Sequence, residues 1–260
     1  MAAPVTKLFS FLARRVERGG AAVAAITGGG GKTTLLYGLG RELAKRRRVL
    51  LTATTKIFSP TPDECENVFI GDARSCAAFL AATPRPSLTA AGALRDEKNK
   101  LHGYSPHELE MLLAGGAADF VAAECDGSRG RSLKYYGDHE PPVPQGCRFV
   151  LAVAGVDALG KKADEESVFR AEAFRALHGL EEGAAITERE YLKYLRCEEN
   201  GPLKNAPRAA EKILILNKWD EADEEGRGRL AGVIPALLES YDAVLCVSER
   251  ENILYGYTER

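Results

Sequence analysis

The chain has 260 residues, of which 45% are hydrophobic and 28% charged, and this balance excludes a mainly disordered protein. A net charge of −2 argues against a protein whose main task is to coat nucleic acid or an anionic membrane. Chains of this length bury roughly 70–75% of their unfolded surface, so the core needs neither disulfides nor a structural metal.

Two features bear on where the protein works. The longest nearly uninterrupted apolar run, Phe149 to Leu159, is far shorter than the roughly 20 residues that span a bilayer, so we expect no transmembrane helix. Residues 1–18 indicate an amphipathic surface helix rather than a secretory signal, which favours a cytoplasmic protein.

The cysteines are scattered singly, which disfavours zinc binding and disulfides, and we expect mostly buried thiols at Cys65, Cys76, Cys125, Cys147, Cys197 and Cys246.

The first predicted element is a strand at Ala21 to Ile26. Glycines follow it, and then a helical pattern from Thr33 to Arg46 places its leucines on one face. These residues predict a strand, a loop and a helix in immediate succession.

Short continuous apolar runs recur along the rest of the chain and are typical of parallel strands that are buried on both faces. They lie at Val49 to Thr54, Phe120 to Glu124, Arg148 to Ala154, Ile213 to Leu216 and Ala243 to Val247. A further short edge strand is expected at Ser87 to Ala91. The pattern predicts an α/β fold with a doubly wound, mostly parallel sheet of the P-loop NTPase type.

Capping signals mark two helix starts, at Ser105 and at Thr187. Between Asp157 and Pro207 the strand signals stop, and helical segments appear near 165–177 and 187–196, which indicates a helical insertion or small lid beside the sheet. We therefore divide one compact unit into an N-terminal helix (1–18), a first core part (19–156), the helical insertion (157–209) and a second, base-binding core part (210–260).

The strongest motif is ITGGGGKTT at 26–34, because it lies where a buried strand passes into a helix. Glycines let the backbone wrap around phosphate oxygens, the helix N-terminus offers free amides, and a lysine adds a cation. The letters fit the GGxGK[ST] form, although Thr27 stands where a lysine often precedes it, which argues against a dimeric ATPase mechanism dependent on that lysine. The alternative is a glycine-rich turn between strand and helix that binds no ligand. The predicted phosphate-binding residues are Gly28, Gly29, Gly30, Gly31, Lys32, Thr33 and Thr34.

A carboxylate is expected to hold Mg²⁺ together with the Thr33 hydroxyl. The strand at 120–124 ends in Glu124-Cys125-Asp126. Asp126 is the favoured metal partner through water, with Glu124 as the competing choice or a water-orienting base. The alternative is a solvated pair of strand-end carboxylates, and Cys125 is expected only to pack.

Late in the chain, a buried strand ends in Asn217-Lys218-Trp219-Asp220, the NKxD pattern with which many GTPases bind guanine. An aspartate accepts hydrogen bonds from N1 and N2 of guanine, a pair that adenine lacks. Asn217 would brace the loop, Lys218 would cover the ring, and the next strand ends at Ser248, where such GTPases present a serine. The order of these elements favours guanine over adenine.

The segment 126–144 is rich in cations and is either a solvated loop or a switch-like segment with a second, anionic ligand. Arg129 or Arg131 would stabilise the transition state of hydrolysis, from within the chain or from a second subunit of a homodimer. The possible second-ligand residues are Lys56, Arg131, Lys134, His139, Glu140 and Arg170.

These motifs together resemble the YqeC family over nearly the whole chain. The matching letters are ITGGGGKTT, LLTATTKI, ECDGSRGRSLK followed by DHEPPVP, VAGVDALGK, VFRAEAF and LNKWD. The resemblance implies a P-loop protein that helps to mature or insert the molybdenum cofactor, or its selenium ligand, in a selenium-dependent molybdenum hydroxylase. By position it places phosphate binding at 28–34, switch residues at Glu124, Asp126 and Arg129, and base binding at Asn217 and Asp220. Lys56, His139, Glu140 and Arg170 match family positions without an assigned role.

We therefore expect a Mg²⁺-dependent nucleotide hydrolase that uses GTP, or else ATP, and acts during maturation of a molybdenum hydroxylase. Catalysis would fall to Lys32, Glu124, Asp126 and Arg129. One alternative is an ATP-dependent kinase or ligase that acts on a small anionic substrate. Another is a nucleotide-gated binding module with negligible turnover. The expected partners are the hydroxylase or its cofactor-handling proteins. We expect no binding to nucleic acid or to a membrane.

Overall fold

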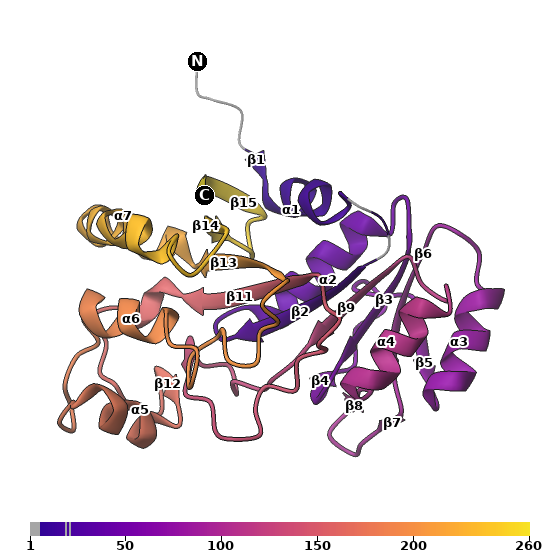
Figure 1. Cartoon of the computed structure of the whole chain (residues 1–260), viewed down its shortest axis with the longest axis horizontal. Helices are drawn as coiled ribbons and strands as arrows, with labels where there is room; N and C mark the ends of the chain where they lie inside the picture. The colour runs from indigo at the N-terminus through magenta and orange to yellow at the C-terminus, as the bar shows by residue number, and fades with distance from the viewer. Residues whose placement is uncertain (1–5, 19, 21) are drawn as a thin grey trace.

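A ten-stranded sheet forms the centre of the fold in the computed structural model, which describes residues 6–18, 20 and 22–260 (Figure 1). Its strand order is β1-β15-β14-β13-β11-β2-β9-β3-β6-β5. From β14 to β5 all neighbours are parallel, and β15 and β1 extend the β14 edge with antiparallel pairs. The strands are β1 (Thr6–Lys7), β2 (Ala22–Gly28), β3 (Arg48–Ala53), β5 (Asn67–Ile70), β6 (Ser87–Gly92), β9 (Phe120–Glu124), β11 (Phe149–Gly155), β13 (Glu211–Asn217), β14 (Ala243–Ser248) and β15 (Ile253–Glu259).

Two small sheets lie beside the central one. The strands β4 (Lys56–Phe58), β8 (Lys100–His102) and β7 (Leu94–Arg95) form an antiparallel sheet. The short strands β10 (Leu133–Lys134) and β12 (Val168–Phe169) pair in parallel.

Helices cover both faces of the central sheet. The buried side chains of β2 alternate, because Ala24 and Ile26 pack in one cluster with α1 (Leu8–Val16) and α2 (Lys32–Leu43), whereas Val23 and Ala25 face the other side. That other face carries α3 (Ala73–Ala82) and α4 (Pro106–Ala114) in one cluster and α5 (Ala171–His178), α6 (Glu188–Leu195) and α7 (Glu224–Leu237) in another. Two 3-10 turns, η1 (Val156–Ala158) and η2 (Trp219–Glu221), follow β11 and β13. The chain is thus a mixed α/β protein with a large, mostly parallel sheet.

The strands predicted from the sequence are present, with bounds that differ by at most two residues on the described part of the chain. Residues 1–5 of the predicted N-terminal helix and Ala21 of the first strand lie outside the described residues. The expected edge position of Ser87 to Ala91 is wrong, because β5 pairs on the outer side of β6. The surface strand that β5 adds has only partly buried residues, so its apolar pattern is weak.

Both capping boxes are confirmed, at Ser105 and at Thr187. The helix expected from 165 begins only at Ala171, because β12 and the left-handed Arg170 precede it. The segment 157–209 packs Phe174, Tyr191 and Tyr194 into the same cluster as strands β11 and β13 of the central sheet. No helix within 6–18 and 22–260 combines the length and apolar character needed to cross a membrane.

Candidate functional site

The loop between β2 and α2 lies at a point where the strand order changes direction. β2 pairs with β9 on one side and with β11 on the other, while the chain itself continues from α2 to β3, beyond β9. Ligands of open α/β sheets bind outside the carboxyl ends of strands at such points. Topology therefore places residues 28–34 where a binding site is expected.

Glycine is required at both ends of this loop. Gly28 has a φ of +96°, and a Cβ there would lie 1.9 Å from the carbonyl oxygen of Val153. Gly31 has a φ of +147°, and a Cβ there would meet the side chains of Glu249 and Asn217 at 2.1 and 2.4 Å. The loop thus touches β11 on one side and the ends of β13 and β14 on the other.

The backbone amides of the loop divide into two groups. The amide of Gly28 donates to Asp126 Oδ2 at 3.1 Å, and that of Gly29 donates to the Val153 carbonyl at 2.9 Å. By contrast, the five amides of residues 30–34 donate to no other group of the described chain. Unpaired donors at a helix N-terminus are a ready anion-binding group, and here they begin at Gly30.

These amides belong to residues that line two adjoining cavities. One cavity, of about 310 Å³, is lined by 30–34, Lys56, Ile57, Phe58, Lys100, Glu124 and 127–130. The other, of about 240 Å³, is lined by Gly30, Gly31, Thr34, Gly130, Asn217, Lys218, Asp220, Glu221, Ser248, Glu249 and Arg250. The two cavities adjoin, because they share Gly30, Gly31, Thr34 and Gly130, and we name them the phosphate-side cavity and the base-side cavity after the ligand groups that the sequence motifs predict there.

Lys32 is buried beside the loop and paired inside the protein. Its Nζ lies 2.9 Å from Asp126 Oδ1, 2.7 Å from the Gly28 carbonyl and 3.7 Å from Glu124 Oε1. Burial alone would lower the pKa of Lys32, but the charges of Asp126 and Glu124 outweigh it and raise that pKa. The ammonium group is therefore charged, and Lys32 is among the residues that line the phosphate-side cavity.

The two candidate metal carboxylates have different surroundings. Asp126 is fully buried, accepts hydrogen bonds from the Gly28 amide and the Tyr136 hydroxyl, and lines neither cavity. Glu124 does line the phosphate-side cavity, and it accepts from Thr33 Oγ1 at 2.9 Å. Burial raises the pKa of Glu124, partly offset by Lys32. The geometry thus pairs Thr33 with Glu124 rather than with Asp126.

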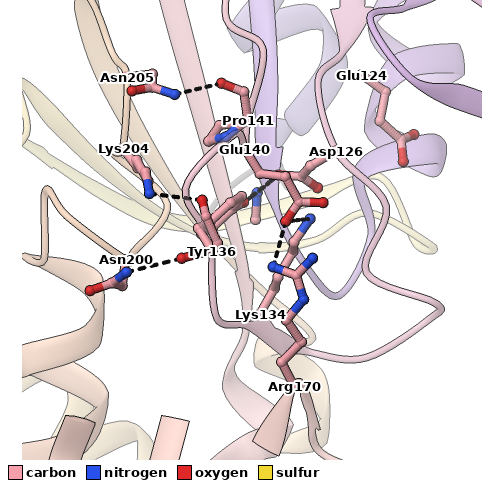
Figure 2. A network of polar contacts seen from close by, with 12 residues as sticks. Glu124, Asp126, Lys134, Tyr136, Glu140, Pro141, Arg170, Asn200, Lys204 and Asn205 are labelled. Carbon is pink, nitrogen blue, oxygen red and sulfur yellow. Dashed lines mark hydrogen bonds and ion pairs between the residues drawn. The ribbon is translucent and has the colours of Figure 1, made fainter. Parts of the chain in front are cut away.

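A second buried network extends from Asp126 towards α5, and Figure 2 shows it. The ammonium of Lys134 and the guanidinium of Arg170 meet at Glu140 Oε2, at 3.3 and 2.8 Å. Lys134 is fully buried, and its Nζ also lies 4.8 Å from the ring centroid of Tyr136. Burial lowers the pKa of Lys134, and the charges of Asp126 and Glu140 offset this only in part.

The six residues expected at a second ligand site do not converge. Lys134, Glu140 and Arg170 form the network just described, whereas Lys56 lines the phosphate-side cavity, 3.7 Å from Asp96. Arg131 instead donates to the backbone carbonyls of Glu165 and Arg129. His139 is exposed. Arg129, predicted to be catalytic, lines the phosphate-side cavity, 5.0 Å from the ring centroid of Phe169.

Asn217 joins the base-side cavity to the loop. Its Nδ2 donates to the Gly30 carbonyl at 2.7 Å, and its Oδ1 accepts from the Glu249 amide at 2.9 Å. This is the bracing geometry expected for the first residue of NKxD. Asp220 lines the same cavity and lies 3.3 Å from the guanidinium of Arg250.

The remaining predicted base-binding residues also line this cavity. Ser248 is buried at the end of β14. The ammonium of Lys218 lies 3.0 Å from Asp157 Oδ2 and 2.9 Å from Ser132 Oγ, which fixes its side chain against η1 and the segment before β10.

Several residues of the site have no counterpart in the sequence prediction: Phe58, Lys100, Tyr136, Asp157 and Glu249. Glu249 directly follows the predicted serine, so its place at the end of the same strand could have been predicted from the sequence. Tyr136 lies in the cation-rich segment 126–144 and Asp157 in the matching letters VAGVDALGK, but neither was given a role, and Phe58 and Lys100 carry no local signal. In the described part of the chain no three His, Cys, Asp or Glu side chains gather as metal ligands. A site for Mg²⁺ needs only one or two carboxylates beside ligand phosphates, and the oxygen donors of Thr33 and Glu124 suit it.

Comparison with known proteins supports a single family. Residues 24–172 match the family described as YqeC protein. The chain is also 32% identical over 207 residues to the uncharacterized protein YqeC of Escherichia coli (strain K12), with 77% of each chain covered. The chain therefore belongs to the YqeC family.

Proposed function

We propose that this protein is a P-loop NTPase that binds a nucleoside triphosphate across the two adjoining cavities. The observation that carries the proposal is the run of five backbone amides at 30–34, which donate to no other group of the described chain and belong to residues that line those cavities. The dipole of α2 adds a positive potential at the same place. A polyphosphate would accept from these donors, which in an empty turn are left to water.

Mg²⁺ would bind between the triphosphate, Thr33 and Glu124, which line the same cavity. The ion would supply positive charge that offsets the charge of the phosphates. Asp126 then has a different task from the one expected, because it holds Lys32 in the absence of nucleotide. Nucleotide binding would transfer the Lys32 ammonium to phosphate oxygens, while the Gly28 amide and the Tyr136 hydroxyl keep Asp126 partnered.

Guanine is the proposed base. Asp220 lines the base-side cavity with Ser248, and Asn217 connects that cavity to the loop. Asp220 is paired with the largely exposed Arg250, an interaction of the exposed kind that costs little to break. The carboxylate is therefore available to accept from N1 and N2 of guanine, for which adenine has no equivalent.

Hydrolysis is the proposed reaction, with Arg129 contributing charge to the transition state from the rim of the phosphate-side cavity. Glu124, which lines that cavity, would also orient the attacking water. The proposed biological setting is maturation of a selenium-dependent molybdenum hydroxylase, and its support is the family resemblance alone. Co-purification of the hydroxylase with the tagged protein tests that setting.

One observation favours a second candidate, phosphoryl transfer to a small anionic acceptor. The phosphate-side cavity extends to Lys56, Lys100 and the 60% exposed ring of Phe58, beyond the loop itself. Lys100 lies 4.5 Å above the ring centroid of Phe58, so a cation and an aromatic face are presented together. Hydrolysis releases phosphate without an acceptor, whereas a transferase consumes the nucleotide only when the acceptor is present.

Replacement of Asp220 tests the proposed function. In Asp220→Asn the side-chain amide matches the oxygen at C2 of xanthine, so we expect GTP affinity to fall and XTP affinity to rise, each about tenfold or more (about 1.4 kcal/mol). Competition titrations with GTP, XTP and ATP measure the change. Equal affinities of the wild type and the variant for all three nucleotides would remove Asp220 from the site.

A further inference from the structure

Glu249 is a buried acid in the wall of the base-side cavity. It follows the last residue of β14, is 2% exposed, and lines the cavity together with Asn217 and Asp220. An acid in the wall of a site for a polyanion is unexpected, because a carboxylate repels phosphate. The role of Glu249 therefore depends on the hydrogen-bond partners and the charges around its carboxyl group.

The carboxyl group of Glu249 lacks partners. Neither Oε1 nor Oε2 accepts or donates a hydrogen bond within the described chain. Burial raises its pKa well above the usual range, while the cations of Lys32 and Lys218 oppose the shift and Glu124 adds to it. A neutral carboxyl has one O–H donor, and a buried donor without an acceptor destabilises the protein until something accepts from it.

The position of this carboxyl points to the missing acceptor. Its Oε2 lies 2.1 Å from the place of a Cβ on Gly31, and Asn217 Nδ2 lies 2.4 Å from the same point. The carboxyl thus lies against the loop at Gly31, as does the side chain of Asn217 at the end of β13. Gly31 lines both cavities, so this is where a nucleotide in the base-side cavity continues into its phosphates.

We propose that Glu249 contacts the nucleotide as a neutral carboxylic acid, which donates its proton in a hydrogen bond to an oxygen of the phosphate chain. The proposal rests on the proposed nucleotide site. When Glu249 loses its proton, the carboxylate faces the phosphates and weakens binding. Glu249 therefore makes the affinity for phosphate-bearing nucleotides depend on pH, and it favours them only while it is protonated.

Other charged groups face Glu249 from the elements around it. They are Lys32 from α2, Lys218 and Asp220 from the segment after β13, Glu124 from β9 and Arg250 from its own segment. Lys32 keeps its charge because its pKa is raised. Glu124 has a raised pKa as well, so the test needs a variant that changes Glu249 alone.

The experiment measures the affinity for GDP from pH 6 to 9.5 for the wild type, Glu249→Gln and the control Glu251→Gln. Glutamine keeps the size and a donor but does not ionise. We expect Glu249→Gln to bind within about threefold of the wild type at pH 6. The ratio of wild-type to variant affinity should then fall at least tenfold by pH 9.5, and this ratio cancels the titration of GDP and of Glu124. Glu251 is largely exposed, so Glu251→Gln should follow the wild type.

Three results would overturn the inference. Identical pH profiles of the wild type and Glu249→Gln show that Glu249 does not titrate in contact with the ligand. Loss of GDP binding in Glu249→Gln at every pH shows that an ionised carboxylate is needed instead. Failure of the wild type to bind GDP at any pH overturns the proposed function as well, and so separates the two failures.

A second measurement holds even if Glu249→Gln does not fold. The wild type is titrated with guanosine and with GDP over the same pH range. Guanine loses its N1 proton at the alkaline end of this range, which weakens both ligands alike, so the test is the ratio of GDP to guanosine affinity. This ratio should fall with pH by more than the phosphate's own titration causes, and a ratio that changes no further would contradict the proposal.

Discussion

Two buried lysines are influenced by the charge of Asp126, and their pKa values are shifted in opposite directions. Lys32 is 2.9 Å from Asp126 and hydrogen-bonded to the Gly28 carbonyl. Lys134 is 3.3 Å from Glu140, and its Nζ has no hydrogen bond of good geometry among the described residues. Full burial favours the neutral amine in both cases, so the quality of the partners decides the outcome.

The difference separates the cation that we propose to bind phosphate from one that only joins parts of the fold. Lys32 is held in its charged form and lines a cavity, so an incoming anion can take the place of Asp126. Lys134 lines neither cavity and joins the segment after β9 to Arg170 at the start of α5. Variants of Asp126, variants of the two lysines and changes of pH each test whether the two lysines differ in this way.

Removal of Asp126 should have the largest effect. Asp126→Ala leaves the charged Lys32 buried without its closest carboxylate, so we expect the free energy of unfolding to fall by about 3–5 kcal/mol. Urea denaturation followed by circular dichroism measures the loss. The matched variant Glu140→Ala should lose only about 1 kcal/mol, because Glu140 is partly exposed and its pair with Lys134 does not prevent burial from lowering the pKa of that lysine. Similar losses in the two variants would contradict the contrast.

Replacement of the lysines by methionine should separate binding from stability. Lys32→Met removes the cation of the phosphate-side cavity, so we expect GTP affinity to fall about tenfold or more (about 1.4 kcal/mol). Lys134→Met replaces a poorly partnered buried amine with an apolar side chain of similar length, and stability should change by less than about 1 kcal/mol. Its GTP affinity should equal that of the wild type. An equal loss of affinity in both variants would place Lys134 in the site.

The pH dependence of stability should show the smallest effect. The folded pKa of Lys134 lies below 10.5, so the native state binds fewer protons there than the unfolded state, and its destabilising effect fades as pH rises towards 10.5. Lys32 has a raised pKa, so its contribution is complete below 10.5 and declines only at higher pH. Between pH 7 and 9.5 the free energy of unfolding of the wild type should therefore rise by up to about 1 kcal/mol relative to that of Lys134→Met. Relative to Lys32→Met it should not change. Urea denaturation of the three proteins at each pH checks both differences.

The central parallel strands β2, β3, β9, β11, β13 and β14 were predictable because each is largely buried on both faces and therefore forms a continuous apolar run. The strand β5 and the small sheet of β4, β8 and β7 lie at the surface and have mixed, short patterns, so they carry no comparable signal. The start of α5 was displaced because Arg170 takes a left-handed conformation that its sequence does not indicate.

The site was predictable where its chemistry is local. The loop at 28–34 begins at the last residue of β2, and the motif at 217–220 begins at the last residue of β13. The fold connects them through the hydrogen bond from the Asn217 side chain to the Gly30 carbonyl. The role of Asp126 depends on Tyr136 and on the amide of Gly28, which approach it through tertiary contacts. A strand-end carboxylate looks the same in sequence whether it faces a cavity or the interior, so the preference for Asp126 over Glu124 could not be tested there.

The central claim is that the amides of residues 30–34 bind the polyphosphate, and amide NMR of the ¹⁵N-labelled protein tests it most directly. On saturation with Mg²⁺·GTP, the amide resonances of Gly30, Gly31, Lys32, Thr33 and Thr34 should shift strongly, because each gains an acceptor. Those of Gly28 and Gly29, already bonded within the protein, should move less. Unchanged resonances for residues 30–34 at saturating GTP would contradict the account.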